Sequence, residues 1–232
     1  MKFTIRENKD LNIDKVPMTC DNLDKDDLRL EKLGLPIKNS AVYMVGPPRS
    51  GKSNLIYQLL HKKQFYKKYF DEIHIFSPSL HTFQKRFLIL DECTHNEFNE
   101  DKIEEILNGF DYTEKNLLLF DDMISQINKA GKSSLLRKIF FNRRHKGATI
   151  WLTSQRYNLL DLSLRNNISH LLLFKISKAE LELIHDEKIT SLSKDEWISL
   201  CNFVFDSPHN FLYIDLLYNT FYKNFNLITL NN

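Results

Sequence analysis

The sequence predicts an α/β fold in which a mainly parallel central sheet is flanked by helices and extended by a C-terminal antiparallel hairpin. Short, continuously apolar segments alternate with amphipathic segments, as expected of a parallel sheet that is buried on both faces. The chain has 232 residues, which is enough for one large domain. Hydrophobic residues make up 42% and charged residues 27%, so the chain can bury a core and is not a disordered polymer.

Each predicted strand is an apolar run that stops at or near a Gly, Pro or polar residue, and each predicted helix repeats its apolar residues at helical spacing. In chain order, we expect a strand at 41–45, a helix at 53–66, a strand at 72–78 that is stopped by its proline, a helix at 101–108, a strand at 117–120, a helix at 134–144, and strands at 148–153 and 170–174. Residues 123–132 are polar, and we expect a loop there.

The two ends of the chain differ in character from this central part. Ser193 and Glu196 have the spacing of a capping box, which predicts a helix through Leu200. After it, residues 203–205 and 211–215 flank a turn and predict the antiparallel hairpin. Residues 1–37 read as a charged N-terminal arm with a short strand at 2–5 and a surface helix at 21–32. We therefore expect an arm at 1–37, a single domain at 38–218 and a tail at 219–232.

Charge and cysteine content exclude several classes of protein. The balance of 32 basic and 30 acidic residues leaves a net charge of +2, so any contact with nucleic acid must be local. Cys20, Cys93 and Cys201 are far apart, which disfavours a disulfide framework and a zinc site. No apolar run is long enough for a membrane span, and the first residues lack an apolar signal segment. We expect the protein to remain in the compartment where it is made.

The strongest motif is the segment from Gly46 to Ser53, GPPRSGKS, which matches the phosphate-binding pattern G-x-x-x-x-G-K-[ST] between a predicted strand and a predicted helix. Phosphate oxygens need backbone N–H donors, a helix N-terminus and a mobile cation. Pro47 and Pro48 have no N–H, so the donors must come from residues 49–53. We expect Lys52 to reach the β- and γ-phosphates of ATP and the Ser53 hydroxyl to bind Mg²⁺. The predicted nucleotide-binding residues are Gly46, Pro47, Pro48, Arg49, Ser50, Gly51, Lys52, Ser53 and Asn54.

Acidic and amide side chains follow two of the other predicted strands. Asp121 and Asp122 end the strand at 117–120, where Asp121 is placed to hold Mg²⁺ and Asp122 to orient or deprotonate the attacking water. Gln155 follows the strand at 148–153, at the sheet edge where ligands of such folds bind, and is a candidate sensor of the γ-phosphate. Arg143 and Arg144 end a helix, and Arg165 lies further on. Arginines near a helix end often only stabilise its dipole, so this interpretation and a catalytic role both stay open.

Five segments resemble, in order and spacing, those of the genome-packaging ATPases of large DNA viruses and virophages, which form the poxvirus-type branch of the FtsK/HerA superfamily of P-loop ATPases. The segments are GPPRSGKSNL, FSP, LLLFDDM, FFNRRHKGATIWLTSQ and LRNN. The resemblance covers residues 38–215. It implies that the acid pair binds metal and activates water, that Gln155 is a sensor, and that an arginine acts on a neighbouring subunit's nucleotide. Arg144 is the first choice, and Arg143 and Arg165 are the alternatives.

The resemblance further implies a P-loop NTPase fold and a homo-pentameric or homo-hexameric ring that moves double-stranded DNA into a capsid through a portal or vertex. It places the protein in the host cytoplasm or viral factory and with the virion during assembly. Lys129 and Lys132 are positioned to line the channel of such a ring.

Two other functions stay open: a helicase or DNA-processing motor of replication or repair, and a nucleotide-dependent switch without translocation. A GTPase is disfavoured, because the segment Asn128–Gly131 has Gly where the guanine-reading motif needs Asp.

Overall fold

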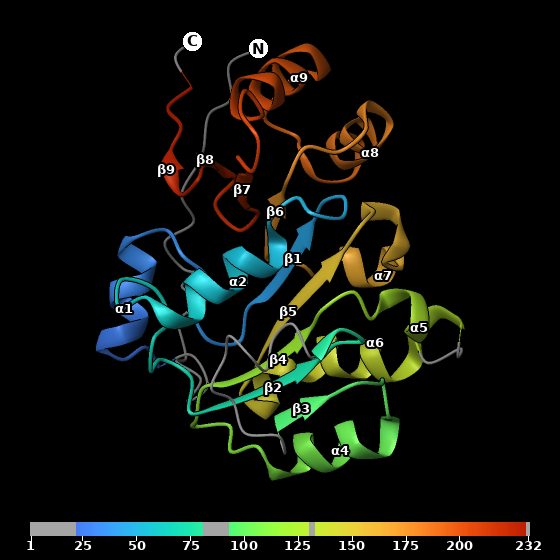
Figure 1. Ribbon diagram of the computed structural model, residues 1–232. Coiled ribbons are helices and arrows are strands. Elements are labelled where there is room, and N and C mark those ends of the chain that lie inside the picture. Colours follow the sequence, from blue (N-terminus) through green and yellow to red (C-terminus); the bar gives the residue numbers. More distant parts are fainter. Residues whose placement is uncertain (1–21, 81–92, 130–132, 231–232) are drawn as a thin grey trace, which may run out of the picture.

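The protein was analysed as a computed structural model that describes residues 22–80, 93–129 and 133–230. In these residues the strands form one sheet in the order β3-β2-β4-β5-β1-β6-β7-β8-β9 (Figure 1). Neighbours from β3 to β6 pair in parallel, and β6 to β9 pair antiparallel. The predicted fold class is confirmed. The strands are β1 Ala41–Val45, β2 Glu72–Phe76, β3 Thr94–His95, β4 Asn116–Phe120, β5 Ala148–Ser154, β6 His170–Leu173, β7 Leu212–Asp215, β8 Thr220–Lys223 and β9 Asn226–Leu227.

Helices cover both faces of the sheet, and each face has its own hydrophobic core. Side chains alternate along each strand, so in β5 Trp151 faces α2 whereas Ile150 and Leu152 face the other layer. Both faces of β1, β4 and β5 are buried, which explains their continuously apolar sequences. The helices are α1 Lys25–Lys32, α2 Lys52–His61, α4 Glu100–Gly109, α5 Ile124–Lys129, α6 Ser133–Asn142, α7 Leu162–Arg165, α8 Lys178–Lys188 and α9 Lys194–Val204, with 3₁₀ turns at Arg143–Lys146 and Tyr157–Leu159.

The hairpin was predicted in the wrong place. Residues 203–205 are not a strand, because α9 continues to Val204 with Leu200, Cys201 and Val204 on its buried side. The hairpin is formed instead by β7 and β8, with Leu212 opposite Lys223. The capping box of Ser193 and Glu196 is present as predicted. The sheet therefore continues beyond Asp215 to β9.

Three other segments also differ from the prediction. The helix after the phosphate loop ends at His61 rather than Tyr66, because Lys62 is extended and the Tyr66 N–H turns back to the Leu59 carbonyl (2.9 Å). The expected polar loop after the acid pair contains α5, which buries Ile124 and Ile127. The helix expected at 134–144 ends at Asn142, and a 3₁₀ turn follows.

The N-terminal helix is attached to the domain rather than free on its surface. A capping box at Asp24 begins α1, whose Asp27 and Leu30 are buried. The hydroxyl of Tyr69 donates to Asp27 Oδ1, and Lys115 Nζ lies 3.8 Å from Asp27 Oδ2. The strand predicted at 2–5 lies outside the described residues.

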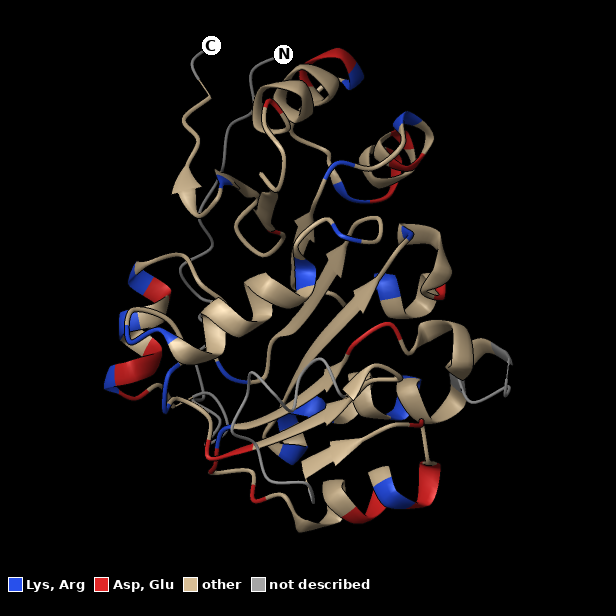
Figure 2. Ribbon diagram, viewed as in Figure 1, with Lys and Arg blue, Asp and Glu red and all other residues tan. Residues whose placement is uncertain are grey.

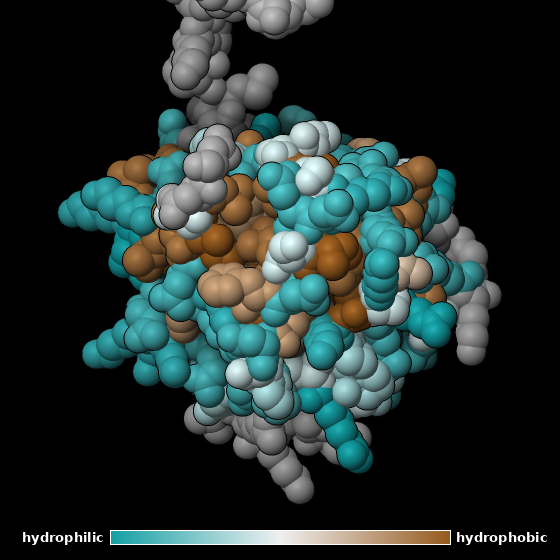
Figure 3. Space-filling view, turned by 90° about the horizontal axis from the view of Figure 1, so that it is seen from above, coloured by the Kyte–Doolittle hydropathy of each residue, from teal (hydrophilic) through white to brown (hydrophobic). Residues whose placement is uncertain are grey.

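In the view of Figure 2, Lys and Arg lie interspersed with Asp and Glu over the outer helices. Seen from above, apolar side chains gather on one face of the molecule (Figure 3). At this end of the fold, α9 exposes Phe203 and β9 exposes Leu227, each more than half accessible. Exposed apolar surface of this kind is available for association with another protein surface. None of the helices in the described ranges has the length and apolar character needed to cross a membrane.

Candidate nucleotide-binding site

Sheet topology brings the predicted site residues to one edge. Strand β5 lies between β1, which leads into the phosphate loop, and β4, which leads into the acid pair. The three strands are parallel, with Val45 opposite Ser154 and Phe120 opposite Leu152. Their carboxyl ends therefore meet at the same edge, where open α/β sheets bind ligands. The phosphate loop, Asp121, Asp122 and Gln155 share this edge.

The phosphate loop has the backbone shape that its glycines permit. Gly51 precedes α2 with φ +111°, a conformation that side-chain-bearing residues rarely adopt. A Cβ on Gly46 would lie 2.7 Å from the Cβ of Phe174, so only glycine fits there. Arg49 also has positive φ (+63°). The loop thus leads into the N-terminus of α2 through glycine backbone that carries no side chain of its own, which is an arrangement that binds phosphate.

Lys52 folds back over this loop. Its Nζ donates to the Gly46 carbonyl at 2.6 Å and to the Pro47 carbonyl at 3.2 Å. Burial lowers its pKa, and the nearby Asp122 and Asp121 carboxylates oppose that shift. The Ser50 hydroxyl is also buried and has no hydrogen-bond partner among the described residues. Within the part of the chain that the structure describes, the Lys52 ammonium is bound only by loop carbonyls, and the Ser50 hydroxyl has an unused hydrogen-bonding capacity. Both groups fit a site that receives phosphate oxygens.

The acid pair is organised by Thr153, at the end of β5. The Thr153 hydroxyl donates to Asp121 Oδ1 at 2.7 Å and accepts from the Asp122 N–H at 3.0 Å. Ser77 donates to Asp121 Oδ2 at 3.3 Å. Burial raises the pKa of Asp121, with a further upward contribution from Asp122. Asp122 has φ +52°, a left-handed conformation that is uncommon for a residue with a side chain and frequent at functional sites.

These groups suit Mg²⁺, which binds proteins through one or two oxygen side chains and takes its other oxygens from phosphates and water. In such a site Asp121 would supply the carboxylate, and Ser53 at the start of α2 would supply the hydroxyl. Nowhere in the described ranges do three or more His, Cys, Asp or Glu residues form a metal cluster. The roles of Thr153 and Ser77 as hydrogen-bond partners of Asp121 were not predicted from the sequence. The available signal was that each carries a hydroxyl and lies at the end of a predicted strand.

Gln155 is exposed at the end of β5, next to an anchored backbone. The hydroxyls of Tyr43 and Ser154 lie 2.6 Å apart, and both donate to the Arg156 carbonyl, at 2.9 and 2.6 Å. Tyr43 is fully buried in β1. The residues on both sides of Gln155 are therefore held against the strand that leads into the phosphate loop.

The three candidate arginines lie in different environments. Arg143 and Arg144 precede β5, at the sheet edge opposite the phosphate loop. Arg143 donates to the carbonyls of Asn39 (2.9 Å) and Phe140 (2.7 Å), and burial lowers its pKa. Arg165 is buried and donates to Glu187 at 2.6 and 3.0 Å. Arg144 is exposed, and its guanidinium bonds to no residue that the structure describes.

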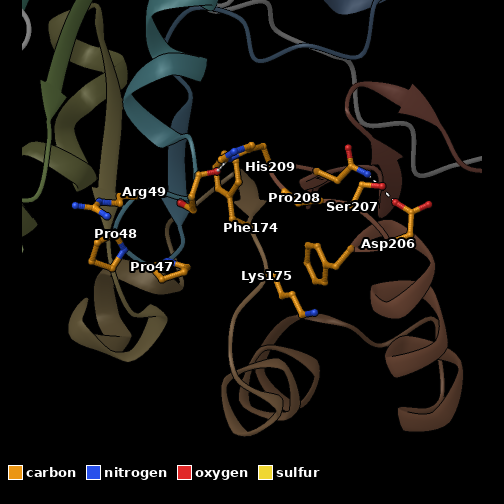
Figure 4. A pocket seen from close by; sticks show the side chains of 12 residues that line it. Pro47, Pro48, Arg49, Phe174, Lys175, Asp206, Ser207, Pro208 and His209 are labelled. Carbon is orange, nitrogen blue, oxygen red and sulfur yellow. Dashed lines mark hydrogen bonds between the residues drawn. The ribbon is translucent and has the colours of Figure 1, made fainter.

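A cleft of about 360 Å³ adjoins the phosphate loop, and Phe174 and Lys175, which directly follow β6, are part of its lining (Figure 4). Pro47, Pro48 and Arg49 form one side of it. Residues 205–210, between α9 and β7, form the other side. His209 reaches the loop itself, because its Nδ1–H donates to the Ser50 carbonyl at 3.0 Å.

Solved structures with the same fold include viral proteins. The genome packaging NTPase B204 from Sulfolobus turreted icosahedral virus 2, in complex with AMPPCP, has 15% sequence identity and a TM-score of 0.57 over 80% of this chain and 96% of that one. B204 from Sulfolobus turreted icosahedral virus, described as a DNA-packaging ATPase, has 16% identity and a TM-score of 0.56 over 83% and 98% of the two chains. At this identity the likeness establishes the P-loop NTPase fold.

No curated protein matches the chain in a sequence comparison. The sequence profile of the family described as "Poxvirus A32 protein" matches residues 34–229, which is most of the chain and includes every predicted site residue. The match confirms the resemblance to the poxvirus-type branch of packaging ATPases. With its phosphate loop, acid pair and sheet order in place, this chain belongs to the Poxvirus A32 protein family.

Proposed function

We propose that the protein is an Mg²⁺-dependent ATPase that drives double-stranded DNA into a preformed viral capsid. The observation that carries the proposal is the meeting of Lys52, the acid pair and Gln155 at one sheet edge, beside a phosphate loop. B204, which has the same fold, is described in complex with AMPPCP and with ATP-gammaS, and this supports nucleotide binding. Membership of the Poxvirus A32 protein family and the description of B204 as a DNA-packaging ATPase support the DNA part.

Each residue has a distinct task in hydrolysis. The N-terminus of α2 and Lys52 bind the phosphates, and Lys52 exchanges the Gly46 and Pro47 carbonyls for phosphate oxygens. Bound Mg²⁺ supplies positive charge that neutralises the phosphate oxygens. Asp122 accepts a proton from the attacking water while its backbone is fixed by Thr153. Gln155 contacts the γ-phosphate side of the site and reports its occupancy along the anchored end of β5.

Asp122→Asn is expected to bind ATP with nearly unchanged affinity and to hydrolyse it about 10²-fold or more slowly, because the amide cannot accept the water proton. The variant keeps the backbone N–H that donates to Thr153. Single-turnover hydrolysis and equilibrium binding of ATP, measured on the same sample, separate the two effects. Asp121→Asn serves as the contrast, since it should weaken binding of the Mg²⁺–nucleotide instead. Wild-type turnover by Asp122→Asn would assign the base to another residue.

The motor assignment requires a ring and a DNA path. A homo-pentamer or homo-hexamer multiplies a few phosphate contacts per subunit, which suits a chain with a net charge of +2. The apolar face of Figure 3 offers surface for association between subunits or with the capsid portal or vertex. Lys129 ends α5, directly after the acid pair, and Lys132 lies outside the described residues. The protein then acts where virions assemble, in the host cytoplasm or viral factory, and joins the virion during assembly.

Duplex DNA should stimulate ATP hydrolysis, and replacing Lys129 and Lys132 together by Ala should reduce this stimulation and its salt dependence more than basal turnover. Fewer phosphate contacts release fewer counterions, so the slope against salt becomes shallower. Lys62→Ala with Lys63→Ala, on an exposed turn, is the matched control. Unchanged stimulation in the first variant would move the DNA path elsewhere. Stimulation by forked but not by plain duplex DNA would favour the helicase alternative over packaging.

A further inference from the structure

A nucleoside triphosphate has a γ-phosphate end and a nucleoside end. The geometry of the site already assigns a place to the γ-phosphate end. Strand β1 has β5 on one side and β6 on the other. Asp121, Asp122 and Gln155 all lie on the β5 side, so the γ-phosphate end of a nucleotide on the phosphate loop points there. The nucleoside end must leave on the β6 side. The cleft of about 360 Å³ opens on that side, between the phosphate loop and residues 205–210, and its volume suits a small-molecule ligand.

The surfaces of the cleft are suited to the flat face of a base. Three prolines and two phenylalanines line it: Pro47, Pro48, Pro208, Phe174 and Phe205. Phe174 and His209 lie close together at the phosphate loop in Figure 4, between the two sides of the cleft. Aromatic rings and apolar walls bind bases by stacking, independently of the base edge.

Most polar groups of the outer wall are already used within the fold. Asp206 accepts from Asn210 and from Lys223, each at 2.7 Å. Asn210 Oδ1 accepts from Asn224 at 2.6 Å. These bonds attach residues 206–210 to the end of β8, so the wall is part of the rigid sheet extension rather than a free loop. A preformed wall costs little to order when a ligand binds.

His209 connects this wall to the phosphate loop. It has φ +66°, a strained conformation for a histidine, and in that conformation its ring reaches the Ser50 carbonyl at 3.0 Å. The ring also lies 3.5 Å from where a Cβ of Gly51 would be, at the start of α2. One side chain therefore contacts the phosphate loop and borders the cleft.

We propose that the nucleoside end of the bound nucleotide occupies this cleft and that the α9–β7 segment, through His209, forms its outer wall and holds the phosphate loop in place. This proposal rests on the proposed ATPase function. It makes the antiparallel extension of the sheet part of the nucleotide site.

The test compares two ligands in the presence of Mg²⁺, ATP and inorganic tripolyphosphate, which has the phosphates without the nucleoside. Wild type should bind ATP about tenfold more tightly than tripolyphosphate, as expected when a base stacks on aromatic surface. Ser207→Trp fills the cleft from an exposed position and should remove that preference while leaving tripolyphosphate affinity unchanged. Thr190→Trp, which adds the same side chain at an exposed position outside the cleft lining, is the matched control and should behave as wild type.

His209→Asn provides a second, more conservative variant. Asparagine tolerates positive φ and keeps an N–H donor for Ser50, so it removes only the ring. It should weaken ATP binding several-fold and leave tripolyphosphate binding as in wild type, whereas His209→Ala should weaken both. Thermal unfolding of each variant confirms that it is folded.

A folded Ser207→Trp that binds ATP as tightly as wild type would overturn the proposal, as would an equal loss of affinity for both ligands in that variant. Failure of wild type to bind either ligand would overturn the ATPase assignment itself, and the cleft proposal with it.

Discussion

Lys52→Ala is expected to lower the rate of ATP hydrolysis by about 10³-fold or more, because a single preorganised donor to developing charge is worth about 10² to 10³ and Lys52 also carries a full charge. Within the described residues, Lys52 is the buried cation of the phosphate loop, with a side chain only 6% exposed. Steady-state phosphate release, measured with saturating ATP and Mg²⁺, gives the comparison.

The control for this experiment is Lys62→Ala, ten residues further along the chain, which removes an exposed lysine and should retain full turnover. Lys52 contacts only loop carbonyls through its ammonium, so its loss should leave the thermal unfolding midpoint close to that of wild type. Turnover above a few per cent of wild type by folded Lys52→Ala would contradict the nucleotide assignment.

Arg144→Ala is expected to reduce hydrolysis by about 10³- to 10⁵-fold in the assembled protein, the range measured for arginines that act on a transferring phosphoryl group. The structure places Arg144 at the sheet edge opposite its own phosphate loop, exposed and unbound to the described residues. If Arg144 acts in hydrolysis, we therefore expect it to act on a neighbouring subunit's nucleotide. Arg165, by contrast, is engaged by Glu187 within its own chain, and Arg143 by two carbonyls.

A mixing experiment tests action between subunits. Arg144→Ala and Lys52→Ala are each inactive alone, but mixed rings place some intact phosphate loops beside intact arginines, so partial activity should return. Lys146→Ala, in the same 3₁₀ turn, should keep wild-type activity. If co-assembled mixtures stay inactive, or if Arg144→Ala alone is fully active, Arg143 becomes the next residue to test.

The local parts of the site were predictable from sequence. The phosphate loop combines two glycines, a lysine and a hydroxyl at fixed spacing. The requirement for each of these residue types follows from the chemistry of phosphate binding alone. The continuously apolar strand before Asp121 likewise predicted a buried strand with acids at its end. In both cases the signal and the structure lie within one short segment of the chain.

The misplaced hairpin shows what sequence pattern leaves open. Phe203, Val204 and Phe205 are three apolar residues in a row, a pattern that fits a strand and a helix end equally. The structure distinguishes their environments: Val204 is buried, whereas Phe203 is 58% exposed. Only the packing of α9 against the sheet, far away in the sequence, decides between the two.

The network around Thr153 was not predictable for a different reason. Its partner Asp121 is 32 residues away, and the contact depends on β5 pairing beside β4 with Phe120 opposite Leu152. The local sequence pattern predicts neither the strand order nor the register. Motifs identified the acids, but the hydroxyl that orients them required the assembled sheet.

The hydrogen bonds from Lys52 to the Gly46 and Pro47 carbonyls also bear on how the site recovers after each cycle. When ADP and phosphate depart, a buried ammonium would be left without partners, at a cost in desolvation. Here the loop's own carbonyls take the place of the departing oxygens, so the ammonium keeps hydrogen-bond acceptors. In the proposed motor, product release would thus leave Lys52 in place for the next nucleotide without rebuilding the loop, which would favour rapid, repeated hydrolysis.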